Sequence, residues 1–202
     1  MRSIIAIAFL SVFLSSCSFI FIELYGMDHN VELLTTEEIN EEENKLNILE
    51  RESFQMDSSF VQYIDDIDTT LWLFQKNNCQ PLQYEVFDGN GKLVSHLVNC
   101  NAGGFPNLKW DWMFDQFPPT SEAGLYDSLL TFGEMNRFLN ITRDITIEGS
   151  KEEYSVVVIW TAAFGRQNKR FIEQVQEFRR THAVNVRYYF VNFDNCFYKF
   201  ND

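Results

Sequence analysis

The side chains with the most versatile chemistry in this sequence are four cysteines and three histidines. A cysteine thiolate can attack an electrophile, bind a metal or form a disulfide, and a neutral imidazole is a common zinc ligand. The histidines lie far apart and lack the spacing of zinc ligands, at His29, His96 and His182. We therefore expect no metal site and no cofactor. The chemistry to explain is that of the cysteines, which are Cys17, Cys79, Cys100 and Cys196.

Cys17 ends a short apolar segment. Residues 4–14 are apolar and come soon after the basic Arg2, as in a signal peptide. Leu14-Ser15-Ser16-Cys17 then places two small residues before the cysteine, and this order resembles the lipobox of bacterial lipoprotein precursors. The resemblance implies cleavage before Cys17, a diacylglycerol on its sulfur and an acylated N-terminus. Residues 1–16 are thus expected to be a signal peptide, followed by a lipid-anchored tether over residues 17–34.

An uncleaved membrane anchor is the alternative for this region. Residues 4–22 are nearly all apolar if the serines are tolerated, and about 20 apolar residues span a bilayer. The residue after Cys17 is Ser18, where the inner-membrane retention signal of lipoproteins has Asp. By resemblance to that sorting signal, we expect a lipid-anchored protein of the cell envelope, in the outer membrane.

Cys79 and Cys100 flank a predicted β-hairpin. Strand-forming residues over 81–87 and 92–98 surround the turn sequence Asp88-Gly89-Asn90-Gly91. If Gly89-Asn90 is the centre of the turn, Phe87 lies opposite Lys92, and the same register places Cys79 opposite Cys100. A disulfide is then one outcome. The other is that a bulge shifts the register, or Pro81 ends the strand early, and both thiols are free.

Gly103, Gly104 and Arg166 form the predicted ligand pocket. Paired glycines permit positive φ, so their amides can make a nest for an anion. Arg166 begins a predicted helix, whose N-terminus favours negative charge. The alternative is that both glycines only serve a turn. A cluster of aromatic residues is either an exposed partner-binding patch or part of the core, namely Trp110, Trp112, Phe114 and Phe117.

The negative charge is concentrated near the predicted anchor. The chain has a formal net charge of −13, and residues 23–68 hold 14 acidic side chains against only Lys45 and Arg51. This balance argues against nucleic acid as a partner, because binding phosphates requires lysine and arginine. The partners that we expect are the membrane, through the lipid, and an envelope protein.

The C-terminal third predicts a βαβ unit. Tyr154–Trp160 is a continuous apolar strand of the kind that is buried on both faces in parallel sheets. Apolar residues at helical spacing follow over 167–182, and a second strand covers 186–193. Helices are also predicted over 36–49, with a capping box at Thr35 and Glu38, and over 58–67. The fold class is therefore α/β, with α+β as the alternative, in one domain over residues 35–202 that contains a mixed sheet.

This βαβ unit resembles a known family. Its first strand ends in Trp160, a helix follows, and its second strand ends in Val191-Asn192-Phe193-Asp194. The same order is similar to that in the thioredoxin-like domains of membrane-tethered thiol–disulfide oxidoreductases. In that family a Cys-Xaa-Xaa-Cys motif opens the helix, where its thiolate is stabilised. The corresponding places here are Phe164 and Gln167, so the family's chemistry cannot be transferred. The resemblance implies a partial or rearranged thioredoxin-like fold, with the hairpin completing the sheet.

These observations predict a membrane-anchored lipoprotein of the bacterial cell envelope that binds a partner without catalysis. The alternative is a divergent thiol–disulfide oxidoreductase that uses Cys79, Cys100 or Cys196.

Overall fold

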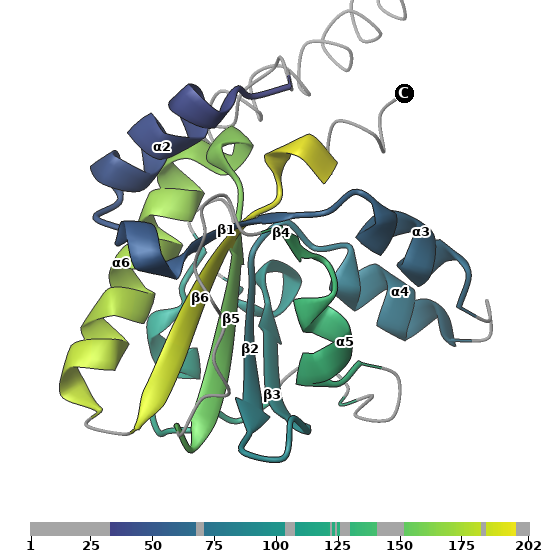
Figure 1. Cartoon of the computed structure of the whole chain (residues 1–202). Helices are drawn as coiled ribbons and strands as arrows, with labels where there is room; N and C mark the ends of the chain where they lie inside the picture. Colours follow the sequence, from purple (N-terminus) through teal and green to yellow (C-terminus); the bar gives the residue numbers. More distant parts are fainter. Residues whose placement is uncertain are drawn as a thin grey trace, which may run out of the picture.

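The protein is described by a computed structural model over residues 33–67, 71–103, 108–121, 123, 125, 130–140, 152–182 and 185–196. Within these residues the chain forms a six-stranded mixed sheet in the order β3-β2-β5-β6-β1-β4. The strands are β1 (Ser53–Met56), β2 (Gln83–Asp88), β3 (Leu93–Val98), β4 (Leu139–Asn140), β5 (Tyr154–Trp160) and β6 (Val186–Asn192). Helices cover the sheet, so the α/β fold class is confirmed (Figure 1).

The predicted βαβ unit is present at the centre of the sheet. β5 and β6 pair in parallel from Tyr154 opposite Val186 to Trp160 opposite Asn192. The helix that connects them is α6 (Gly165–Thr181), which begins two residues before the predicted start. Gly165 has φ +43°, a left-handed backbone conformation that glycine adopts without steric cost. β5 is buried along almost its whole length, as its apolar sequence predicts.

The hairpin forms, but its predicted register is wrong. Glu85 lies opposite His96 and Phe87 opposite Leu93, with a bulge between Val86 and Phe87. The turn is longer than predicted because the Asp88 carboxylate accepts hydrogen bonds from the amides of Asn90, at 2.9 Å, and Lys92, at 3.0 Å. β2 also pairs antiparallel with β5, so the hairpin extends the central sheet.

Two short strands complete the other side of the sheet. β1 pairs in parallel with β6, and β4 pairs antiparallel with β1. Neither strand was predicted. Residues 1–32, which contain the predicted signal peptide, Cys17 and most of the tether, lie outside the described residues.

The helices lie on both faces of the sheet. α2 (Thr36–Lys45) and α6 are on one side, while α3 (Ser59–Asp65), α4 (Trp72–Asn78) and α5 (Phe132–Asn136) are on the other (Figure 1). The predicted capping box is present: Thr35 Oγ1 accepts from the Glu38 amide at 3.3 Å, and Glu38 accepts from the Thr35 amide at 2.8 Å. α2 ends before the predicted residue 49, because Asn47 has φ +55°. None of the helices in the described part of the chain has the length and apolar character to cross a bilayer.

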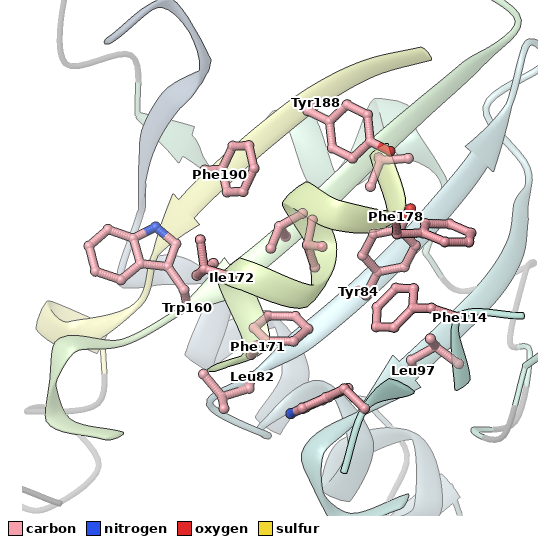
Figure 2. Close-up of a cluster of buried hydrophobic side chains, with 14 of the residues drawn as sticks. Leu82, Tyr84, Leu97, Phe114, Trp160, Phe171, Ile172, Phe178, Tyr188 and Phe190 are labelled. Atoms are coloured by element: carbon pink, nitrogen blue, oxygen red, sulfur yellow. The ribbon is translucent and has the colours of Figure 1, made fainter. Parts of the chain in front are cut away.

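Each face of the sheet has its own hydrophobic core. On the α6 face, Figure 2 shows Phe178 beside Tyr84 and Phe114, and the ring centroid of Phe114 lies 5.0 Å from each of the other two. On the opposite face, Phe54 of β1 contacts Tyr189 of β6 at 5.2 Å between ring centroids. The abundant phenylalanines therefore fill both layers between helices and sheet.

Candidate functional site

Of the residues predicted to form a ligand pocket, Gly103 lies on a loop and Arg166 on the first turn of α6. Gly103 has φ +64°, and its carbonyl accepts a hydrogen bond from the Lys109 amide at 3.2 Å. The Leu108 amide in turn donates to Gln167 Oε1 at 3.1 Å. The loop is therefore bound to α6 through Gln167, a contact that the sequence did not predict. Arg166 is exposed on the same turn, and Gly104 lies outside the described residues.

A buried carboxylate already occupies the amides at the carboxyl ends of β5 and β6. Asp194 accepts hydrogen bonds from the backbone amides of Ala162 at 2.8 Å and Ala163 at 3.2 Å. Its other donors are the Thr161 hydroxyl and the Asn192 side-chain amide. These positions commonly bind anions in parallel α/β sheets. Here the Asp194 carboxylate takes the place of a bound anion, so these amides stabilise the fold at this edge of the sheet.

The two places where the thioredoxin-like family carries cysteines are occupied by packed side chains. Phe164 is half-buried, and Gln167 is buried beneath the loop that it binds. Two residues beyond Leu108, Trp110 packs on Phe171 of α6 at 4.4 Å between ring centroids. The loop therefore closes over the start of α6 by direct contact.

The cysteines of the described region form no disulfide and lie in three different environments. Cys79 is half-buried at the end of α4, Cys100 is exposed after β3, and Cys196 is buried. The structure thus has the second of the two predicted outcomes for Cys79 and Cys100, with a shifted register and no bridge. Burial raises the pKa of Cys79 to about 11, so little of it is thiolate at neutral pH. This geometry does not favour a thiol enzyme.

A groove of about 710 Å³ lies between α6, the turn after α2 and residues 108–111. Leu46, Leu108 and Trp110 supply its apolar lining. Charged side chains of both signs also line it, namely Lys109, Asp111, Arg170, Glu173, Glu177 and Arg180. Among the described residues, Glu177 pairs with Arg180 and Glu173 with Lys169, whereas neither Lys109 nor Arg170 forms an ion pair. Sequence reasoning did not find this groove, because it joins three separate segments.

Two contacts fix the walls of the groove. Gln176 Nε2 donates to the carbonyl oxygens of Leu46 at 3.0 Å and Asn47 at 3.2 Å, which joins the turn after α2 to α6. Arg179 forms two hydrogen bonds of 2.8 Å with the Glu52 carboxylate and lies 4.7 Å from the Tyr188 ring centroid. Paired bonds of this kind fix orientation as well as position. Together these contacts hold the turn after α2 and the residues that follow it against α6.

The predicted aromatic patch is mostly core. Trp110 and Phe114 are buried, and Phe117 is half-buried. Only Trp112 is exposed, and its indole donates to the Ala102 carbonyl at 3.0 Å. Trp110 nevertheless contributes to the groove, so the patch is connected to a surface through that one residue.

A buried polar cluster between β2 and β3 was also missed. Gln83 Nε2 donates to the carbonyl oxygens of Asn78 at 2.9 Å and Gln80 at 2.7 Å, so Gln83 Oε1 is left to accept from His96 Nε2 at 3.0 Å. Glu85 Oε1 lies 3.7 Å from His96 Nε2, and neither Glu85 oxygen has a hydrogen-bond partner among the described residues. Burial raises the pKa of Glu85 to about 8 and lowers that of His96 to about 4.

No group of three histidine, cysteine or acidic side chains converges in the described region. Comparison with known proteins gives no match: no family model, no curated protein and no solved structure is similar to this chain.

Proposed function

We propose that this protein is a lipoprotein of the bacterial cell envelope, anchored through Cys17, that binds a partner protein without catalysing a reaction. The support for the anchor is the order Leu14-Ser15-Ser16-Cys17 after an apolar segment. Two or more acyl chains on one cysteine hold a protein at a membrane almost permanently, since each buried methylene contributes about 0.8 kcal/mol. The domain would then act close to that membrane.

The observation that carries the binding role is the groove along α6. Its lining combines apolar side chains with charged side chains of both signs, and protein interfaces likewise join apolar and polar surface. Lys109 and Arg170 have no ion-pair partner within the described residues, although the protein as a whole is strongly acidic. A protein segment that presents a carboxylate beside an apolar side chain would complement them.

The anchor is tested by mass spectrometry of the protein isolated from bacterial membranes. The expected N-terminus begins at an acylated Cys17. Cys17→Ala should keep Met1 and lose the acyl groups, whereas Cys100→Ala, a matched change at an exposed thiol, should be processed normally. An intact Met1 without acyl groups in the unmodified protein would reject the anchor. Ser18→Asp should move the protein from the outer-membrane to the inner-membrane fraction.

The groove is tested with a photo-crosslinking amino acid at position 174, in its wall. A discrete crosslinked partner is expected in intact envelopes. Lys109→Glu with Arg170→Glu should reduce the yield at least tenfold, because both of these charges are reversed. Lys76→Glu, on α4 across the sheet, makes one charge reversal outside the groove and should leave the yield unchanged. Equal yields in all three proteins would show that the groove is not the binding surface.

A further inference from the structure

Glu85 and His96 are directly opposite each other on neighbouring strands and are both completely buried. His96 Nε2 carries a hydrogen, because the amide of Gln83 presents its oxygen to it. With one hydrogen on the imidazole and one on the carboxyl group, the pair carries no net charge. A buried neutral pair is far less costly than a single buried charge.

The groups that face this pair offer no charge to compensate for ionisation. On the other side of β2, β5 places Val157 opposite Glu85 and Ile159 opposite Gln83. The end of α4 contributes the Asn78 carbonyl and then the half-buried Cys79 thiol. Burial alone shifts the pKa values of Glu85 and His96, so no charged side chain of the described region stabilises either ion.

His96 also connects the pair to the outer edge of the sheet. Its amide donates to Ser121 Oγ at 3.2 Å, and its carbonyl accepts from the Ala123 amide at 3.2 Å. Ser121 Oγ donates to the same carbonyl at 3.1 Å. Movement of His96 would therefore change the hydrogen bonds that hold Ser121 and Ala123 along β3.

We propose that Glu85 and His96 form a proton-dependent latch: β3, together with Ser121 and Ala123, stays against β2 while both side chains are neutral. Loss of the Glu85 proton, or gain of a second proton by His96, places one uncompensated charge in the core. The charge is hydrated most easily if β3 opens, because β3 is at the edge of the described sheet, whereas β2 lies between β3 and β5. This device is independent of the lipid anchor and of the groove.

The direction of the pH effect follows from the two titrations. The pKa of Glu85 is raised from 4.5 to about 8, so its contribution to stability is complete below pH 4.5 and is lost as the pH rises through 8. The pKa of His96 is lowered from 6.5 to about 4, so its contribution is complete above pH 6.5 and is lost as the pH falls through 4. The two changes oppose each other between pH 4.5 and 6.5. The latch should therefore loosen on both sides of this window.

Hydrogen exchange of the full-length protein in detergent tests the latch. After correction for intrinsic exchange, the opening constant of a peptide covering β3 should rise up to tenfold per pH unit between pH 6.5 and 8. Glu85→Gln keeps the size and shape of the side chain but has no proton to lose, so its profile should be flat there. Glu41→Gln, the same change at an exposed position outside the groove, should behave as the unmodified protein does.

A rise of equal size in Glu85→Gln, or none in the unmodified protein, would overturn the proposal. If Glu85→Gln does not fold, carbon-13 NMR of the unmodified protein decides the question. The carboxyl carbon of Glu85 should titrate well above the ordinary range, and the His96 ring should stay neutral down to about pH 5. Titration of either group in its ordinary range would also overturn the proposal.

Discussion

Asp194 and Glu85 are both buried carboxyl groups, but only Asp194 is surrounded by hydrogen-bond donors. Two backbone amides, a hydroxyl and a side-chain amide donate to Asp194. Each charge-assisted bond contributes about 1.5–3 kcal/mol, whereas a buried polar group without partners costs free energy. The first carboxylate therefore stabilises the junction of β5, α6 and β6, and the second makes the hairpin sensitive to protons.

Asp194→Asn should lower the free energy of unfolding by about 3 kcal/mol, because the new NH2 group faces donors instead of accepting from them. Urea denaturation followed by tryptophan fluorescence measures the change. Asp115→Asn, the same substitution at an exposed residue, should alter the free energy by less than about 0.5 kcal/mol. A loss below about 1 kcal/mol in Asp194→Asn would contradict the structural role assigned to this carboxylate.

At the scale of elements, the sequence predicts those strands and helices that a local pattern of apolar residues determines. The continuous apolar run of β5 and the periodic apolar residues of α6 both indicated the correct structure. β1 gave no such signal, because its four residues are placed by pairing with β6, far away in the sequence. α4 exposes Trp72 and Leu73, so it lacks the apolar stripe by which an amphipathic helix is found.

The candidate sites show the same division. Gly103 and Arg166 could be singled out because glycine and a helix N-terminus have local signatures, but neither residue lines the groove. Gln167 was missed because an amide side chain gives no sign of the loop that it will bind. Glu85 alternates with apolar neighbours, a pattern typical of a strand with one solvent-exposed face. Helices cover that face instead, and only the tertiary structure reveals it.

The capping box of α2 can be tested by a pair of adjacent threonines. Thr35→Ala should lower the free energy of unfolding by about 1 kcal/mol, because the hydroxyl that accepts from the Glu38 amide is lost. Thr36 is the first residue of the helix, and its side chain forms no hydrogen bond within the described residues. Thr36→Ala should therefore change the free energy of unfolding by about a few tenths of a kcal/mol at most. Thermal unfolding by circular dichroism compares the two. Equal losses would show that the box does not stabilise the helix.

At the scale of the whole molecule, the fold determines how accessible each described cysteine is. In the native protein at pH 7.5, a maleimide should label Cys100 first, since Cys100 is exposed. Cys79 should react slowly, because its pKa is about 11, and Cys196 only after unfolding in urea. Peptide mass spectrometry identifies the labelled sites.

Cys100→Ala supplies the control for this labelling, because it should remove the fast phase and leave the slower reactions unchanged. Rapid labelling of Cys79 would instead support the alternative that the protein is a thiol–disulfide oxidoreductase. Resistance of both Cys79 and Cys100 until a reductant is added would indicate that they are bridged in solution.

The pairing of β1 with β6 determines when this chain can finish folding. Phe54 lies opposite Val191, so β1 obtains its parallel partner from a strand far later in the sequence. Until β6 has been synthesised, β1 has only the short β4 as a neighbour among the described strands, and Phe54 cannot reach Tyr189. A sheet of this topology cannot be completed before β6 is made, and removal of β6 would leave β1 without its parallel partner.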